Sequence, residues 1–168
     1  MLIALAGLPG AGRSTLAKGL QASLHAEIVS RDTIRMAEFP EWDDRAAKRA
    51  AFEIVRLDVG LLLRAGATVI VDGATLATQA ERRELHELAS SLGVPFLLLW
   101  LDLPPAVAAQ RIGADAHEAP PDRQADLAHV VAGRFECPEG REAAVRLDAR
   151  AAASEVLVAA LAAVRARR

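Results

Sequence analysis

The chain has 168 residues, of which 52% are hydrophobic and 25% charged, and its net charge is −2. This length and balance predict one globular domain over residues 1–168 and exclude an intrinsically disordered chain. The acidic balance, the absence of Tyr and an aromatic content of 4% argue against a nucleic-acid partner or an anionic membrane surface. Cys137 is the single cysteine, which excludes an internal disulfide and a cysteine-rich metal site. No apolar run reaches membrane-spanning length and the first one is too short for a signal peptide, so a cytoplasmic protein is expected.

The chain opens with a buried strand, a glycine-rich loop and a helix. The strand is the apolar run Leu2–Ala6, and the helix carries Leu16, Leu20 and Leu24 on one face. Such a loop turns its backbone N–H groups around a phosphate, and the helix N-terminus adds its positive end. The alternative is a strand-to-helix turn without a ligand. The candidate nucleotide-binding residues are Gly7, Gly10, Ala11, Gly12, Arg13, Ser14 and Thr15.

One position departs from the phosphate-loop pattern. The pattern has Lys before the Ser/Thr, and this chain has Arg13. Arginine is longer, planar and bidentate, so the exchange is not conservative. Arg13 is therefore a candidate catalytic residue, and the exchange of lysine for arginine bears on whether the protein catalyses phosphoryl transfer. Ser14 is a candidate Mg²⁺ ligand.

A polar cluster follows the second predicted strand, Ala26–Val29. Ligands of parallel α/β sheets gather at the carboxyl ends of strands, so this cluster is placed like a binding site. Asp32 and Arg35 are three residues apart on the next helical turn and can face one cleft. Asp32 would accept a proton from an acceptor hydroxyl, and Arg35 would hold the acceptor. The alternative makes Asp32 a helix N-cap and Arg35 a solvated side chain.

A long helix is expected up to about Ala65, with an apolar stripe that includes Phe52 and Val59. Its cations lie mostly outside this stripe and predict a solvated face. The alternative is that some of them line an acceptor pocket. These cations are Arg45, Lys48, Arg49 and Arg56.

The third predicted strand, Thr68–Asp72, is apolar and ends in a carboxylate. This is the form of a strand whose last residue orients Mg²⁺ or its water, which makes Asp72 a candidate metal residue. Thr78 and Glu81 form a capping box, so a helix is expected from there to Gly93.

The last third of the chain predicts two more strands and a helical lid. The strands are Pro95–Asp102 and Val145–Asp148, and Ser154 is expected to cap the final helix. Between the strands, residues from about 113 to 141 are arginine-bearing and flanked by loops, as a lid that neutralises phosphate charge would be. Arg123 and Arg134 are the lid candidates, although each fits a solvated surface helix equally well.

The combined pattern resembles the P-loop kinases of the adenylate-kinase-like branch. More narrowly, it is similar to small AAA-type ATP-binding kinases related to polynucleotide kinase domains, zeta toxins and chloramphenicol phosphotransferase. The resemblance implies a three-layer α/β P-loop NTPase fold with a five-stranded parallel sheet, binding ATP and Mg²⁺. It also implies that Asp32 is the general base, that Arg35 binds the acceptor and that Arg111 lies near the nucleotide. The segment from Asp148 through Arg150 to Ala151 would lie by the adenine. The resemblance rests on residues 7–12, 30–35, 71–76 and 134–136.

The function that these features predict is ATP-dependent phosphorylation of a hydroxyl on a small molecule. A 5′-hydroxyl polynucleotide kinase is one alternative, which the scarcity of aromatic residues does not favour. A non-catalytic ATP-binding module is the other, and Arg13 is the residue that favours it.

Overall fold

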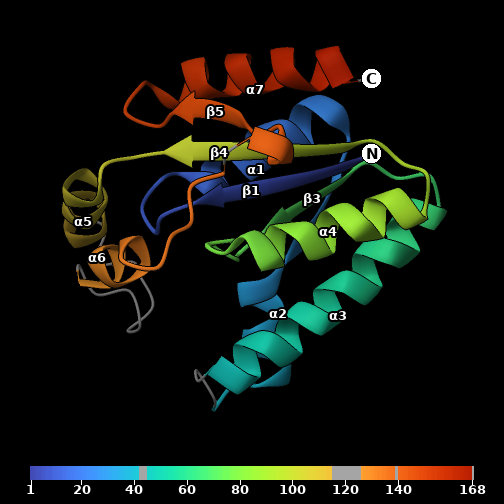
Figure 1. Cartoon of the computed structure of the whole chain (residues 1–168), viewed down its shortest axis with the longest axis horizontal. Helices are drawn as coiled ribbons and strands as arrows, with labels where there is room; N and C mark the ends of the chain where they lie inside the picture. Colours follow the sequence, from blue (N-terminus) through green and yellow to red (C-terminus); the bar gives the residue numbers. More distant parts are fainter. Residues whose placement is uncertain (42–44, 115–125, 139, 168) are drawn as a thin grey trace.

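A computed structural model describes residues 1–41, 45–114, 126–138 and 140–167 (Figure 1). Five parallel strands form one sheet in the order β2-β3-β1-β4-β5. This confirms the predicted α/β class and the five-stranded parallel sheet, with the first strand between the third and fourth. The strands are β1 (Leu2–Gly7), β2 (Glu27–Ser30), β3 (Val69–Asp72), β4 (Phe96–Asp102) and β5 (Val145–Asp148).

Helices cover both faces of the sheet, which gives the expected three layers (Figure 1). The alternation of β1 shows the arrangement, since Ile3 and Leu5 belong to one core and Leu2 and Ala4 to the other. The first core also takes in α1 and α7, and the second takes in α3 and α4. The helices are α1 (Arg13–Leu24), α2 (Arg31–Glu38), α3 (Arg45–Arg64), α4 (Gln79–Ser91), α5 (Pro105–Ala114), α6 (Asp126–Ala132) and α7 (Ala153–Arg167), with the short 3₁₀ turn η1 (Gly140–Glu142).

Two helix starts test the capping predictions. The box at the start of α4 is present as predicted, with Thr78 and Glu81 bonding each other's backbone N–H groups. The prediction for the last helix is wrong by two residues, because α7 begins at Ala153 and Ser154 lies inside its first turn. The carboxylate of Glu155 accepts the N–H of Ala152, the residue just before the helix, at 3.2 Å, as the glutamate of a capping box does.

Strand register brings the polar residues that end the strands to one edge of the sheet. Ser30 is paired with Asp72, and Asp102 with Asp148. Within the part of the chain that the structure describes, no helix is both long and apolar enough to span a membrane.

Candidate active site

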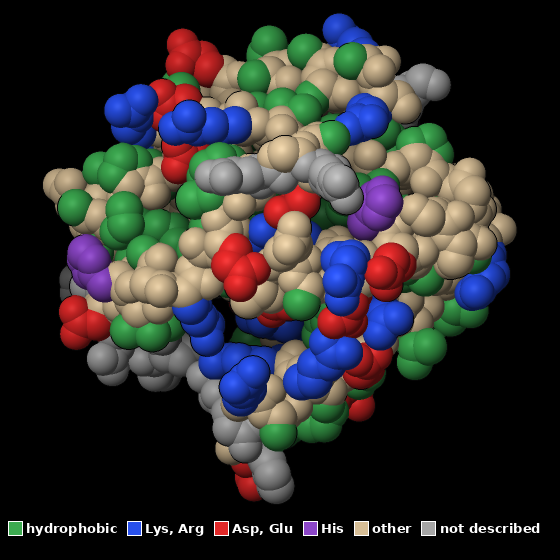
Figure 2. All heavy atoms as spheres, viewed as in Figure 1, with side chains coloured by type: hydrophobic (Ala, Val, Ile, Leu, Met, Phe, Trp, Pro, Cys, Tyr) green, Lys and Arg blue, Asp and Glu red, His purple; other side chains and the backbone are tan. Residues whose placement is uncertain are grey.

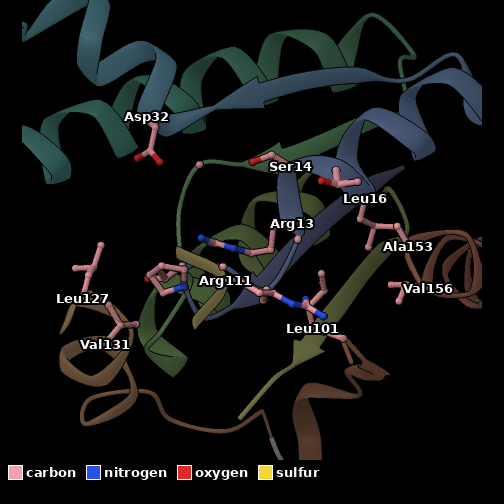
Figure 3. A pocket seen from close by; sticks show the side chains of 18 of the residues that line it. Arg13, Ser14, Leu16, Asp32, Leu101, Arg111, Leu127, Val131, Ala153 and Val156 are labelled. Carbon is pink, nitrogen blue, oxygen red and sulfur yellow. The ribbon is translucent and has the colours of Figure 1, made fainter. Parts of the chain in front are cut away.

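A cleft of about 740 Å³ opens at the carboxyl edge of the sheet (Figure 3). Its walls come from the loop after β1, the starts of α2 and α3, the α5–α6 side and the loop after β5. This volume lies within the range typical of small-molecule sites. The described lining residues are Pro9–Leu16, Arg31, Asp32, Lys48, Gly73, Thr75, Leu101, Arg111, Ala114, Leu127, Val131, Arg134, Ala149–Ala153 and Val156.

The glycines of the loop after β1 serve two purposes. Gly12 has a φ of +86°, and a Cβ placed there would meet no protein atom within 4 Å, so the space beside it is open. Gly7 and Gly10 instead allow close packing, since a Cβ on either would come within 2.8 Å of a backbone oxygen, that of Leu101 or Ala108. The loop therefore has open space beside Gly12 and is closely packed against the rest of the protein at Gly7 and Gly10.

Arg13 extends from this loop into the cleft, between Asp32 and Arg111 in Figure 3. One terminal nitrogen of its guanidinium, Nη1, donates a hydrogen bond to the carbonyl oxygen of Ala74. Ala74 lies two residues beyond Asp72, so the arginine joins the loop after β1 to the loop after β3. The positive charge of Arg13, which stands where the phosphate-loop pattern has lysine, thus lies within the cleft.

Asp72 ends β3 behind the cleft wall and is 7% exposed. Its Oδ1 is buried and has no hydrogen-bond partner in the structure, which is unusual for a carboxylate oxygen. Ser14 lines the cleft at the start of α1. Among the described residues, no three His, Cys, Asp or Glu side chains gather into a metal cluster. A hydroxyl and one carboxylate suit Mg²⁺, which keeps several waters and takes further ligands from substrate phosphates.

Asp32 lies in the first turn of α2, but it is not the helix cap. That role belongs to Ser30, whose Oγ accepts the N–H of Thr33 at 3.3 Å. The carboxylate of Asp32 instead pairs with Arg31, Nη2 to Oδ1, at 2.9 Å. Gly73 has a φ of +73°, and a Cβ there would lie 2.6 Å from the backbone nitrogen of Asp32. Glycine at this position therefore lets the loop after β3 pass directly beneath the start of α2, which places Asp32 at the cleft.

The other predicted cations divide into three groups. Arg111 on α5 and Arg134 after α6 both line the cleft. Arg35 lies one turn along α2 from Asp32 and is not among the lining residues. Arg123 lies outside the described residues. Lys48 on α3 does line the cleft, although its helix was interpreted mainly as a solvated face.

The far end of the cleft is formed by the loop after β5. Arg150 lines it and forms a two-pronged ion pair with Asp148, at 2.9 Å and 2.8 Å. The Arg150 side chain, followed by its backbone N–H, lowers the pKa of Asp148 to about 2. The same ion pair raises the pKa of Arg150. The lining beyond Arg150 is small and apolar, from Ala151 to Val156.

Sequence reasoning missed a buried arginine that anchors the segment returning from α6. Arg82 is 1% exposed, bonds Glu142 with two nitrogens at 2.6 Å and 2.8 Å, and donates to the carbonyl oxygen of Leu76 at 2.9 Å. A signal was available, because Arg82 falls in the same helical stripe as the buried Leu85 and Ala89.

Glu136 provides a second attachment for the same segment. Its Oε2 accepts the N–H of Gln79 at 2.6 Å, and its own N–H bonds the carbonyl oxygen of Ala77 at 2.8 Å. Nearby, Phe135 stacks on Trp100 with ring centroids 6.3 Å apart. The segment that carries Arg134 to the cleft is therefore fixed to the loop between β3 and α4.

Comparisons with known proteins agree with this architecture. Residues 2–138 match the family model of the AAA domain. A gluconokinase from Sinorhizobium meliloti 1021 is 19% identical, with a TM-score of 0.74 over 98% of this chain and 92% of that one. A sugar kinase from Janibacter sp. HTCC2649 is also 19% identical, with a TM-score of 0.74 over 98% and 94%. The APS kinase of Mycobacterium tuberculosis, in complex with AMPPNP and APS, is 15% identical, with a TM-score of 0.70 over 98% and 96%. No curated protein sequence matches the chain.

Proposed function

The chain belongs to the AAA domain family and has the fold of P-loop kinases, and from this premise we propose that it is an ATP-dependent kinase. It transfers the γ-phosphoryl group of ATP to a hydroxyl of a small molecule. The observation that carries the proposal is the cleft itself, which unites the phosphate loop with Arg13 and, on the facing wall, the carboxylate of Asp32. A protein that only binds nucleotide needs no such carboxylate.

The nucleotide occupies the side of the cleft built by β1, α1 and the loop after β5. The amides of residues 10–15 hold its phosphates, and the support is that these residues line the cleft and that the space beside Gly12 is open. Arg13 and Arg111 face these phosphates, and Arg134 approaches them from the α6 side. The adenine lies against the small apolar residues that follow Arg150.

Ser14 and, indirectly, Asp72 would hold Mg²⁺, and this would give the unpartnered Oδ1 of Asp72 a role. When bound, the ion neutralises charge on the phosphates during transfer.

Asp32 acts as the general base. It accepts the proton of the acceptor hydroxyl as that oxygen forms a bond to the γ-phosphorus. The bond between the γ-phosphorus and the β–γ bridging oxygen breaks, and ADP leaves. Arg31, at 2.9 Å from the Asp32 carboxylate, orients it toward the cleft. Arg35 binds the acceptor further out on α2.

The lid proposed over residues 113–141 of a single domain, 1–168, is represented in the structure by its described parts, 113–114, 126–138 and 140–141. The support for this is that Leu127, Val131 and Arg134 reach the cleft from this segment. Apolar side chains together with an arginine exclude water and neutralise charge at the transferring group.

The test is transfer of labelled γ-phosphate from ATP into a pool of hydroxyl-bearing metabolites, with an Asp32→Ala variant as the control. The proposal expects a labelled small molecule with the wild type and none above background with the variant. A 5′-hydroxyl oligonucleotide in a parallel reaction tests the polynucleotide kinase alternative. ATP binding without transfer to any acceptor would overturn the proposal in favour of a binding module.

A further inference from the structure

Arg134 is one of the cations that line the cleft. Figure 2 shows Lys and Arg side chains gathered around a hollow of the surface between α6 and α2. Two other cations of the cleft are held by ion pairs, Arg31 with Asp32 and Arg150 with Asp148. Between the Arg134 side chain and the other described residues, the structure shows no hydrogen bond or ion pair. The position of this guanidinium therefore depends on how its backbone is held.

The backbone that carries Arg134 is fixed on both sides. Before it, the N–H of Arg134 itself bonds the carbonyl oxygen of Val131 at 3.1 Å, at the end of α6. After it, Glu136 forms two bonds, from its N–H to the carbonyl oxygen of Ala77 at 2.8 Å and from the N–H of Gln79 to its Oε2 at 2.6 Å. Only the second of these bonds uses the side chain of Glu136, so a substitution can remove it.

The carboxylate of Glu136 is bonded to the start of a helix. Gln79 is the first residue of α4, so the carboxylate lies at the positive end of that helix, where a negative charge is stabilised. A hydrogen bond from a backbone N–H to an ionised carboxylate is also stronger than one between neutral groups. The helix is a firm support, because Arg82, one turn further along, is 1% exposed and bonds both Leu76 and Glu142.

The loop between β3 and α4 also holds Arg13. Nη1 of Arg13 donates to the carbonyl oxygen of Ala74, three residues before the carbonyl oxygen of Ala77 that accepts the Glu136 N–H. In the sheet, β3 lies on the side of β1 away from β5, and its loop passes beneath the start of α2. The loop is therefore at the end of the cleft where the proposed function places the γ-phosphate and the acceptor. Attachment to it brings the segment of Arg134 to the same end.

We propose that Glu136 is a positioning residue for phosphoryl transfer, which holds Arg134 at the γ-phosphate on the same loop that holds Arg13. This inference rests on the proposed kinase function. Glu136 is not among the residues that line the cleft, so it acts through the backbone of Arg134. When the bond between Glu136 and α4 is lost, the Arg134 guanidinium loses its fixed place, and its charge-assisted hydrogen bond to the γ-phosphate weakens.

The test measures the contribution of the γ-phosphate to nucleotide binding, for which no acceptor is needed. Calorimetry gives the affinities of AMPPNP and ADP, each with Mg²⁺, and their ratio isolates the contacts to the third phosphate group. Glu136→Ala should lower AMPPNP affinity about tenfold or more and change ADP affinity by less than about threefold. Glu136→Gln keeps an oxygen that accepts the Gln79 N–H and should retain the wild-type ratio. A wild-type ratio in Glu136→Ala would overturn the inference.

Glu81→Ala is the matched control. Oε2 of Glu81 accepts the N–H of Thr78 at 3.0 Å, so Glu81 and Glu136 serve neighbouring N–H groups at the start of α4. Both alanine variants should lower the midpoint of thermal denaturation, because each removes a partner of the helix start. Only Glu136→Ala should change the ratio of AMPPNP to ADP affinity. An equal change in both variants would mean that a weakened α4 is the cause, which contradicts a positioning role.

Arg134→Ala completes a double-mutant cycle. It should reproduce the loss of AMPPNP affinity, and adding Glu136→Ala to it should cause no further loss, since the two residues act as one unit. Losses that simply add would mean that Glu136 does not act through Arg134, and the inference would be wrong.

The two proposals fail in different ways. Phosphoryl transfer by Glu136→Ala at the wild-type rate, to the acceptor found in the metabolite screen, would overturn the positioning role and leave the kinase standing. A preference for AMPPNP over ADP that depends on Glu136 and Arg134, with no transfer to any acceptor, would overturn the kinase. It would leave Glu136 as the residue that positions Arg134 at a bound nucleotide.

Discussion

The two sides of the cleft are built in different ways. The side proposed for the nucleotide is centred on one contiguous loop, residues 9–16, whose conformation depends on glycines such as Gly12 with its φ of +86°. The side proposed for the acceptor is made of side chains brought together by tertiary structure, Arg31 and Asp32 from α2 and Lys48 from α3. A local motif can specify the first side, whereas only the packing of α2 and α3 against the sheet specifies the second. Substitutions on the two sides should therefore impair different properties, nucleotide affinity on the first side and the rate of transfer on the second.

The largest effect is expected at Gly12. Its φ of +86° strains any other residue, and a side chain there would enter the open space that the phosphates need. Gly12→Val should lower ATP affinity more than 100-fold by calorimetry.

Gly66→Val is a closely matched control. Gly66 has a φ of +83° and, like Gly12, no protein atom within 4 Å of a Cβ, but it is remote from the cleft lining. Both variants should lose about 1–2 kcal/mol or more of unfolding free energy from backbone strain, and only Gly12→Val should lose nucleotide. Wild-type ATP affinity in Gly12→Val would contradict the phosphate-loop assignment.

Substitutions on the side proposed for the acceptor should lower kcat and leave nucleotide affinity unchanged. Asp32→Asn keeps the shape of the side chain and removes the base, so transfer should fall by about 10²–10⁴-fold while ATP affinity stays unchanged. Asp148→Asn, on the nucleotide side, should instead alter the KM for ATP and leave kcat nearly as in the wild type. Steady-state kinetics at saturating acceptor distinguish these outcomes. A kcat insensitive to Asp32→Asn would exclude Asp32 as the base.

The ion pair between Arg82 and Glu142, which anchors the segment after α6, should contribute to the free energy of unfolding. Glu142→Gln removes the negative charge that compensates Arg82, which is 1% exposed, and should cost about 3–5 kcal/mol of unfolding free energy. Asp102→Asn breaks the ion pair with Arg146, which is 69% exposed, and should cost no more than about 1 kcal/mol. Chemical denaturation measures both. Similar losses in the two variants would mean that burial does not set the strength of the Arg82 anchor.

The smallest effect is a pH dependence on the nucleotide side. Arg150 holds the pKa of Asp148 at about 2, below its ordinary 3.8. Because the folded pKa is depressed, the pair contributes stability above pH 3.8, and this contribution is lost as pH falls through about 2. In Arg150→Gln, NMR titration should find the Asp148 pKa raised back toward 3.8. An unchanged pKa would show that another group is responsible.

The sequence predicted the features that depend on local pattern. Continuous apolar runs correctly placed β1 between β3 and β4, because a central parallel strand is buried on both faces. The capping box of α4 was also local and correct. Arg82 was missed although it falls in the buried stripe of α4, because an arginine is rarely buried without a partner and Glu142 lies 60 residues away.

The candidate site shows the same division. The loop between β1 and α1, which is predicted to hold phosphate, could be read from nine consecutive residues, but the place of Lys48 at the cleft could not. Its neighbour Arg49 is exposed and binds Glu84 at 2.8 Å. Lys48 falls in the helical stripe of Phe52, Val55 and Val59, which distinguishes the two cations, but the stripe alone does not show that this end of it meets the cleft. Their separation depends on how α3 packs on the sheet.

The most direct test of the kinase account is the behaviour of Arg13, the residue that departs from the phosphate-loop pattern. Single-turnover ADP formation is measured with the acceptor found in the metabolite screen, for wild type, Arg13→Lys and Arg13→Ala. If Arg13 engages the transferring group, Arg13→Ala should lose about 3 kcal/mol of transition-state stabilisation, or more than 100-fold in rate, and Arg13→Lys should hold or raise the rate. An ADP burst that is the same for all three side chains would place Arg13 away from the phosphates and contradict the catalytic role of the loop.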